Sequence, residues 1–157
     1  MNKKTLKGIK ANRTIHLIDI ENLCGSCDLS IAAVEQARAA YFDATQPGID
    51  DLFVIAASNH NQEAAAFGWP NGKHVFRSGQ DGADIELALV MINEHLDQRF
   101  QTVVLASGDG GLAPFAEHLM QLGSELKVVC LDRCLSHQLR ALHCPILNIE
   151  ETFGLAA

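Results

Sequence analysis

Three acidic residues are the side chains of this sequence best placed to do chemistry. Asp19 lies at the end of the apolar run 14–20. Asp109 follows a second apolar run in the motif Ser-Gly-Asp-Gly, and Asp84 opens an expected helix in Asp-Gly-Ala-Asp. Carboxylate oxygens are ligands that suit Mg²⁺ and Mn²⁺, and such ions polarise a phosphodiester and activate a bound water. We therefore expect Asp19, Asp84 and Asp109 to meet as catalytic residues and as ligands of one or two divalent ions.

Each of these acids also has an ordinary structural interpretation. Asp19 could cap or tie a loop, and Asp109 could be a turn residue between glycines. Asp81 could cap the helix, with Asp84 in its first turn, where a negative charge is favoured by the helix dipole. An acid follows an apolar strand twice in 157 residues, which favours the metal site over three unrelated structural roles.

The chain alternates apolar runs with helical patterns. We expect strands at residues 14–20, 51–57, 73–77, 102–106, 126–131 and 145–149. We expect helices at 28–42, capped by Asp28, and at 58–67, 81–96, 112–122 and 136–142. In the helix at 81–96, a set of apolar residues shares one face, namely Ile85, Leu89, Ile92 and Leu96.

This alternation predicts a three-layer α/β/α sandwich with a mainly parallel sheet of five or six strands. The last strand begins at Pro145, which suits an edge position. Ligands of such sheets bind beyond the carboxyl ends of the strands. Asp19, the segment 58–61 and the segment 107–109 all follow strands, so we expect them at the same edge.

Two further segments are candidates for binding an anionic substrate. The residues Ser58-Asn59-His60-Asn61 open a helix, where free backbone amides beside Asn59 could hold a phosphate. The simpler alternative is that Ser58 or Asn59 caps the helix. Arg77, with Ser78, could meet a phosphate of the substrate, or it could be an ordinary surface charge.

Length and charge indicate one acidic domain with a basic extension. The chain has 157 residues, 48% of them hydrophobic, and a net charge of -7. Five of the 12 Lys and Arg lie in residues 1–13, and all 19 acids follow them. We therefore divide the chain into a basic N-terminal arm, 1–13, and a single domain, 14–157. The arm could contact phosphates, or it could be a solvated end of the chain.

The sequence shows no signal for membrane insertion or secretion. No apolar run approaches the roughly 20 residues that span a bilayer. The basic residues 1–13 precede a run that is too short for a signal peptide and that His16 and Asp19 interrupt. We expect a cytoplasmic protein that does not contact membranes.

The five cysteines offer two alternative chemistries. The pair Cys24-Gly-Ser-Cys27 precedes a helix, as in thioredoxin-like redox sites, where the thiol pKa is depressed. Zinc could instead join this pair to other residues of the chain, drawn from Cys130, Cys134, His137, His143 and Cys144. The third interpretation is that the thiols are reduced and serve as small buried apolar residues.

Four short motifs occur in order between residues 14 and 131. They are Ile-Asp19-Ile-Glu-Asn22, Gly82-Ala-Asp84-Ile-Glu-Leu-Ala, Leu-Ala-Ser107-Gly-Asp109-Gly, and Pro114 with Leu122-Gly123. This set resembles the NYN branch of the PIN-like ribonuclease domains. The resemblance implies the sheet order 3-2-1-4-5, a site for Mg²⁺ or Mn²⁺ and endonucleolytic cleavage of RNA. It also implies that Asn22 and Ser107 accompany the metal-binding acids, where they would fix the carboxylates or contact the scissile phosphate.

The chain departs from the family pattern at two positions. The family usually has an acid six residues after the helix Asp and another two residues after the Ser-Gly-Asp carboxylate. Here these positions hold Val90 and Gly111. Glu21, Asp81 and Glu86 are candidate substitutes.

We therefore expect a metal-dependent endoribonuclease acting on single-stranded RNA, with a homo-oligomer or a protein partner as a possible assembly. The main alternative is a module with the same fold and a weakened site that binds RNA or a protein. Less favoured alternatives are a CxxC thiol-disulfide oxidoreductase and a phosphotransferase or phosphatase with Asp19 as nucleophile.

Overall fold

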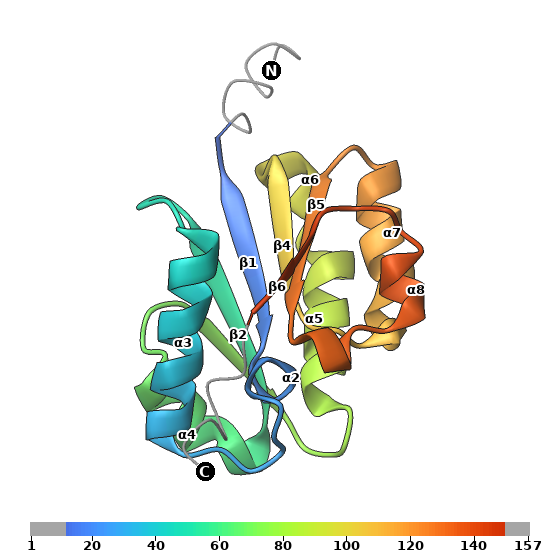
Figure 1. Cartoon of the computed structure of the whole chain (residues 1–157). Helices are drawn as coiled ribbons and strands as arrows, with labels where there is room; N and C mark the ends of the chain where they lie inside the picture. The colour runs from blue at the N-terminus through green and yellow to red at the C-terminus, as the bar shows by residue number, and fades with distance from the viewer. Residues whose placement is uncertain (1–11, 150–157) are drawn as a thin grey trace.

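One sheet of six parallel strands forms the centre of the molecule (Figure 1), in a computed structural model that describes residues 12–149. Its order is β3-β2-β1-β4-β5-β6. The strands are β1 Thr14–Asp19, β2 Leu52–Ser58, β3 Lys73–Arg77, β4 Thr102–Ala106, β5 Glu125–Cys130 and β6 Ile146–Asn148. The predicted α/β class, the parallel sheet and the order 3-2-1-4-5 are confirmed, and β6 adds the expected strand at the edge.

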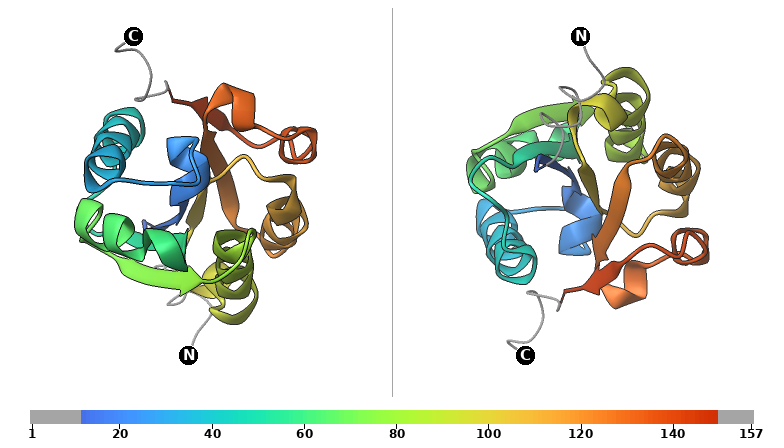
Figure 2. Two further views of the ribbon diagram at one scale, coloured as in Figure 1. Left: turned by 90° about the horizontal axis from the view of Figure 1, so that it is seen from below. Right: turned by 90° about the horizontal axis from the view of Figure 1, so that it is seen from above.

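Helices cover the sheet on both faces (Figure 2). The helices are α2 Ile20–Cys24, α3 Ile31–Thr45, α4 Gln62–Gly68, α5 Gly82–Asn93, α6 Leu96–Arg99, α7 Ala113–Gln121 and α8 His137–Arg140. Three short 3₁₀ turns are η1 Asn59–Asn61, η2 Gly110–Leu112 and η3 Asp132–Cys134. Helices α3 and α4 lie on one face, and α5, α7 and α8 lie on the other. No helix among residues 12–149 is long and apolar enough to cross a membrane.

The central strands are mostly apolar because both of their faces are buried. In β1, Leu17 packs in the core beneath α5 and α7, and Ile18 packs in the core beneath α3 and α4. His16, in the middle of this strand, is 2% exposed, and both of its ring nitrogens have a polar partner. Its Nδ1 lies 2.6 Å from the Tyr41 hydroxyl, and its Nε2 lies 3.0 Å from Asp51 Oδ2. Burial lowers the pKa of His16, although Asp51 opposes this effect.

The N-terminal arm is described only at its last residues. Arg13 places its guanidinium 5.0 Å from the centre of the Phe100 ring, and its carbonyl accepts from the backbone N–H of Gln101 at 2.9 Å. Arg13 is therefore packed at the start of β1. The rest of the proposed arm, residues 1–11, and the segment 150–157 lie outside the described residues.

Two predictions about helix ends were wrong. Ser30 caps α3, because its Oγ accepts from the Ala33 N–H at 3.1 Å, whereas Asp28 lies outside the helix. The helix predicted at 81–96 ends at Asn93, and after His95, which has a φ of 49°, Leu96 opens the separate helix α6. The short helix α2, which follows β1 at once, was not expected.

Helix α5 does not bury the apolar face that we identified from the spacing. Its buried side chains are Leu87, Val90 and Met91, together with Ala83. Ile85 is 45% exposed, Leu89 is 37% exposed and Ile92 is 54% exposed. Both sets of residues have helical spacing, so periodicity alone could not tell which set faces the sheet.

Paired substitutions in α5 test this assignment of faces. Leu87→Ala is expected to lower the free energy of unfolding by about 2–5 kcal/mol, because Leu87 is fully buried. Ile85→Ala is expected to cost less than about 1 kcal/mol, because nearly half of Ile85 is exposed. Urea denaturation of both variants measures the difference, and equal losses would contradict the assignment.

Candidate functional site

Asp19 ends β1 and lies against Ser107, which follows the neighbouring strand β4. The Ser107 hydroxyl donates to Asp19 Oδ2 at 3.0 Å, and the Asn22 N–H donates to Asp19 Oδ1 at 3.2 Å. Asp19 is 4% exposed and Ser107 is fully buried. The Asn22 contact makes Asp19 the N-cap of α2. Capping leaves Asp19 at the carboxyl edge of the sheet, so this structural role is compatible with metal binding.

The loop after β4 is held by contacts from α2 and from its own side chains. Asn22 Oδ1 accepts from the Gly108 N–H at 2.8 Å. The Asp109 N–H donates to Ser107 Oγ at 3.2 Å, and Asp109 Oδ1 accepts from the Gly111 N–H at 2.6 Å. A Cβ at Gly108 would lie 2.1 Å from the Cys134 carbonyl oxygen, so the loop requires glycine there. These contacts fix the position of the Asp109 carboxylate.

Asp84 lies in the first turn of α5, within hydrogen-bonding reach of both Asp19 and Asp109. Its Oδ1 is buried and has no hydrogen-bond partner among the described residues. The helix can start this close to the sheet because of Gly82, where a Cβ would lie 2.3 Å from the Arg77 carbonyl oxygen. The structure therefore brings the three predicted acids together, with Asp84 next to both of the others.

The three acids cannot all be ionised easily in this setting. Burial, followed by the charge on Asp19, raises the pKa of Asp84 from 3.8 to about 9. Burial also raises the pKa of Asp19 to about 6, although the Asn22 N–H and the Ser107 hydroxyl partly oppose it. Without a cation, Asp84 keeps a proton at neutral pH.

The donor set fits a hard divalent cation that retains water. It offers carboxylate oxygens, and one of them is buried without a hydrogen-bond donor. No group of three or more His, Cys, Asp or Glu side chains within residues 12–149 forms a ready-made metal site. Mg²⁺ is commonly held by one or two carboxylates together with waters and substrate phosphates, so a closed cage of protein ligands is not required.

Glu21, Asp81 and Glu86 are the candidates to replace the acids absent at positions 90 and 111. Two of them already accept hydrogen bonds from other residues. Glu21 Oε1 accepts from the Ser58 N–H at 2.9 Å and from Asn61 Nδ2 at 2.7 Å. Glu86 Oε1 accepts from Arg77 Nε at 2.9 Å. Asp81, which precedes α5, lines the same cleft as Asp84 and Asp109 and is the remaining candidate.

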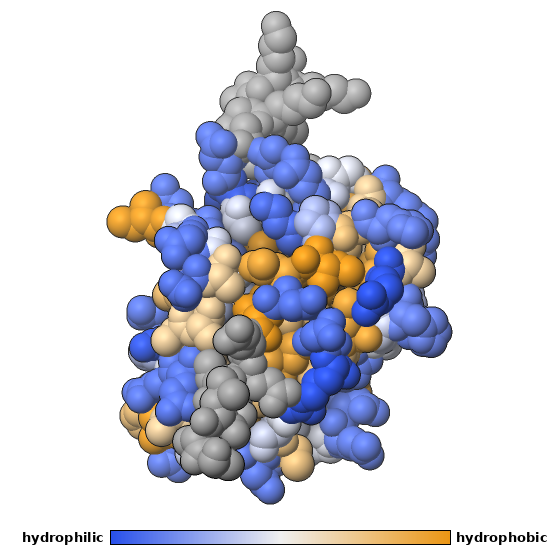
Figure 3. Space-filling model, in the orientation of Figure 1, coloured by the Kyte–Doolittle hydropathy of each residue, from blue (hydrophilic) through white to orange (hydrophobic). Residues whose placement is uncertain are grey.

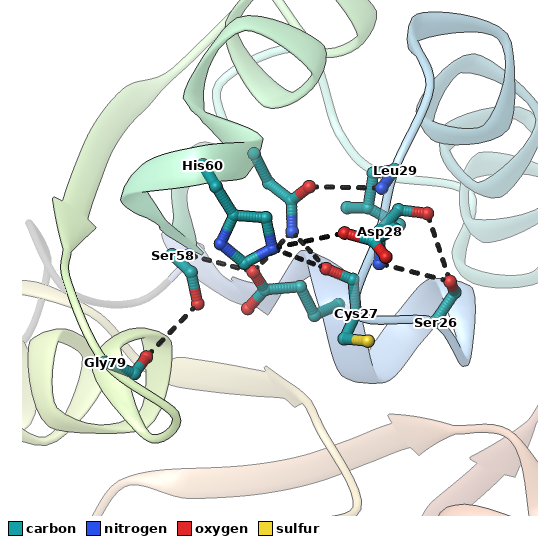
Figure 4. A network of polar contacts seen from close by, with 9 residues as sticks. Ser26, Cys27, Asp28, Leu29, Ser58, His60 and Gly79 are labelled. Carbon is teal, nitrogen blue, oxygen red and sulfur yellow. Dashed lines mark hydrogen bonds and ion pairs between the residues drawn. The ribbon is translucent and has the colours of Figure 1, made fainter.

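Asn61 belongs to the segment 58–61 singled out above, but the sequence analysis missed its structural role at this edge. It is 2% exposed, donates to the Cys27 carbonyl at 2.8 Å and accepts from the Leu29 N–H at 3.1 Å. Figure 4 shows Cys27, Leu29, Ser58 and His60 gathered around this network. In the sequence, Asn61 stands directly before an Ala-rich helix, and this position indicates where the helix starts. It does not indicate that Asn61 binds Leu29, which is 32 residues away.

The residues predicted to bind substrate lie at different distances from the acids. Asn22 and Ser107 contact the acid site directly, as described above. Asn59 is exposed and donates to Ser78 Oγ at 2.6 Å, and Arg77 pairs with Glu86. Ser58 is the N-cap residue of η1, although its side chain makes no capping hydrogen bond, and Asn59 caps neither η1 nor α4. Contact of Asn59 or Arg77 with phosphate stays a prediction.

The cysteines do not form the predicted redox pair. Burial, with the charges of Asp19 and Glu21, raises the pKa of the Cys24 thiol to about 12, whereas the redox mechanism requires a depressed pKa. Cys24 is buried, Cys27 is exposed, and both are free thiols. A zinc site at these residues is not supported either, because no suitable cluster occurs within residues 12–149.

The two positions that depart from the family pattern have different surroundings. Val90 is 5% exposed and packs in the core. Gly111 is exposed beside the acid site, and a Cβ there would lie 3.0 Å from Asp109 Oδ1. An acid at position 111 would therefore reach the site, whereas one at position 90 would lie in an apolar core.

A second cleft lies on the other face of the sheet, away from the acids. It has a volume of about 490 Å³ and includes Val104, Val129 and Leu147 among its lining residues. Figure 3 shows the apolar side chains that gather beside α3 on this face. Thr14 and Thr102, which start β1 and β4, line the same cleft. It therefore opens toward the amino ends of the strands.

Fold and site together define an α/β protein with a carboxylate cluster at the carboxyl edge of a parallel sheet. The model of the NYN domain family matches residues 13–142. Because this match covers most of the chain, the protein belongs to the NYN domain family, a family of PIN-like ribonucleases. Its members generally use divalent metal ions. The resemblance predicted from the motifs is confirmed.

Two solved structures were found to be similar to this chain, and the first of them supports the fold. A protein of unknown function from Vibrio parahaemolyticus RIMD 2210633 is 16% identical, with a TM-score of 0.61, over 88% of this chain and 93% of that chain. A candidate Mar1 ribonuclease from Leishmania donovani is 9% identical, with a TM-score of 0.44, over 91% of this chain and 80% of that chain. The first similarity shows the fold alone, and the second is too low to carry an argument. No curated protein matches the sequence.

The unpartnered oxygen of Asp84 gives a prediction about stability. In EDTA, Asp84→Asn is expected to raise the free energy of unfolding by roughly 1–3 kcal/mol, because the amide needs no charge and can donate to a neighbouring carboxylate. The folded-state pKa of Asp84 is raised, so wild-type stability falls as pH rises from about 4 to about 9. The gain from the substitution should therefore increase over that range.

Thermal denaturation across this pH range measures the effect. Asp43→Asn is the matched control, because Asp43 is an exposed acid of α3 far along the chain from the site. Mn²⁺ should stabilise the wild-type protein and Asp43→Asn, but it should stabilise Asp84→Asn much less. A loss of stability in EDTA for Asp84→Asn would contradict the account of the site.

Proposed function

We propose that this protein is an endoribonuclease that depends on a divalent metal and hydrolyses phosphodiester bonds in single-stranded RNA. The observation that carries the proposal is the buried Asp84 Oδ1, which has no hydrogen-bond donor and lies beside two further carboxylates. Such an arrangement is unfavourable for stability unless one carboxyl keeps a proton or a cation is bound. Membership of the NYN family indicates that the substrate is RNA.

In this proposal, Asp19, Asp84 and Asp109 hold Mg²⁺ or Mn²⁺ and are the catalytic residues. When bound, the metal would supply charge stabilisation at the phosphate and a water of lowered pKa. The Ser107 hydroxyl and the Asn22 N–H hold the Asp19 carboxylate in place. With a cation bound there, Asp84 would be ionised and its carboxylate would serve as a ligand.

Other side chains at the same edge of the sheet are placed to bind the RNA on either side of the scissile bond. Asn59 and Arg77 follow or end the neighbouring strands β2 and β3. Both are exposed, and we assign them to the phosphates next to the scissile bond. Arg77 would share its guanidinium between Glu86 and the phosphate. A cytoplasmic location, expected from the sequence, is part of the same proposal.

A second candidate function is binding without catalysis, in which the same fold binds RNA or a protein and does not cleave RNA. The observation in its favour is the replacement of two family acids by Val90 and Gly111. The three remaining acids still converge, and Asp81 lines the same cleft, which is why we favour the enzyme.

Cleavage of a labelled single-stranded RNA tests the proposed activity. The wild-type protein is expected to cleave with Mn²⁺ and not with EDTA. Asp19→Asn should lower the rate by about 100-fold or more, because it removes a charge that holds the metal. Asp43→Asn should leave the rate unchanged. Activity that persists in EDTA or in Asp19→Asn would overturn the metal-dependent mechanism, and no cleavage by any sample would favour the binding module.

A charge restored at position 111 tests whether the missing acids limit metal binding. Gly111→Asp is expected to tighten the Mn²⁺ dissociation constant by about 10-fold, since affinity at oxygen sites follows the number of charged ligands. Gly111→Asn has a side chain of the same size without the charge and should not tighten binding. Isothermal titration calorimetry compares the two variants, and equal affinities would show that position 111 does not reach the ion.

A further inference from the structure

A cleft of about 470 Å³ adjoins the acid site on the face of the sheet that α5 and α7 cover. One wall is a stripe of α5 that begins with Asp84 and continues through Ile85, Leu89 and Ile92. The opposite wall comes from η2 and α7 and includes Leu112 and Phe115. Helices α5 and α7 lie side by side in both views of Figure 2.

The two ends of this cleft differ in character. Asp81, Asp84 and Asp109 lie at one end, and the other described residues that line the cleft are apolar or glycine. The three side chains of α5 that point outward, Ile85, Leu89 and Ile92, are between 37% and 54% exposed. The fold does not need them for its core, so their apolar character requires another explanation.

We propose that this cleft holds the unpaired base of a nucleotide next to the scissile phosphate. The inference rests on the proposed function and adds a base-binding subsite to it. A phosphate bound at the acid end would place the adjoining nucleoside along the apolar stripe. The volume falls within the range of small-ligand pockets, and the mixture of a few polar groups with apolar walls is typical of them.

The lining decides which property of the base is recognised. Phe115 is half-buried and offers an aromatic surface, while the small residue Ala88 leaves space on the facing wall. Among the described residues of the cleft, the three acids are the only polar side chains, and they are needed for the metal. The cleft therefore binds a base through stacking and apolar contact, and it accepts all four bases.

The same argument predicts a preference for single-stranded RNA. A base inside the cleft cannot remain stacked and paired in a duplex, so it must be unpaired before it enters. A protein partner is less consistent with the shape, since a concave space of about 470 Å³ suits one flat ring better than the broad surface of a stable interface. An apolar protein partner that covered the cleft would also bury the acids at its end, and burial of unpaired charges is unfavourable.

RNA with a single abasic nucleotide tests the subsite without altering the protein. The wild-type chain is assayed with Mn²⁺ on RNAs that lack the base immediately before the cleaved bond, immediately after it, or several nucleotides away. Removal of one adjacent base is expected to lower kcat/KM by about 5- to 100-fold, as for loss of one stacked base. Exchange among the four bases at that position should change kcat/KM by less than about 3-fold.

Variants of the cleft should remove this sensitivity. Phe115→Ala and Ala88→Phe are expected to lower kcat/KM on intact RNA and to make the abasic RNA an equally good substrate. Phe67→Ala and Ala39→Phe are the matched controls, because both positions are exposed on α4 and α3. These controls should keep the wild-type discrimination between intact and abasic RNA.

The possible failures are distinguishable. If intact and abasic RNAs are cleaved equally by the wild-type chain, the subsite is wrong and the nuclease stands. If intact RNA is not cleaved, the proposed function fails and the subsite fails with it. A wild-type dimer in sedimentation that Ile92→Glu converts to monomers would assign the cleft to a second copy and overturn the inference.

Discussion

Repulsion among Asp19, Asp84 and Asp109 is the interaction around which this edge of the sheet is built. Each comes from a different part of the chain, and each is held by contacts that keep it near the others despite the cost. Burial raises the pKa of Asp19 and of Asp84, which shows that ionisation is disfavoured there without a counter-charge. A proton relieves the repulsion in the free protein, and a divalent cation would relieve it more effectively. Stability and the proposed activity therefore oppose one another at Asp84.

The surrounding residues explain how the acids are held. Parallel pairing of β1 with β4 brings Asp19 beside Ser107, and Asn22 ties α2 to the loop that carries Asp109. A second set of contacts, centred on Glu21 and Asn61, joins α2 to the start of α4. The acid site is consequently held by hydrogen bonds on the sheet side, whereas the cleft on its other side is lined by exposed apolar residues of α5. This contrast is consistent with the proposed metal site and with the base subsite proposed beside it.

The sequence predicted the parts of this arrangement that depend on local pattern and topology. Continuous apolar strands indicated a parallel sheet, and a parallel sheet places Asp19 and Asp109 at one edge. The sequence did not predict which face of α5 is buried, because Leu87 and Ile85 belong to equally good helical patterns. It did not predict the role of Glu21, whose partners Ser58 and Asn61 are 37 and 40 residues away. Long-range side-chain contacts have no signature in a single sequence.

The most direct test is a crystal structure of the protein soaked with Mn²⁺, with anomalous scattering recorded at the manganese absorption edge. The account predicts an anomalous peak beside Asp84, coordinated by that carboxylate together with Asp19 or Asp109 and by water. The same peak should be lost in Asp84→Asn. Manganese bound elsewhere, with no anomalous peak beside the three carboxylates, would contradict the claim that this cluster is a metal site.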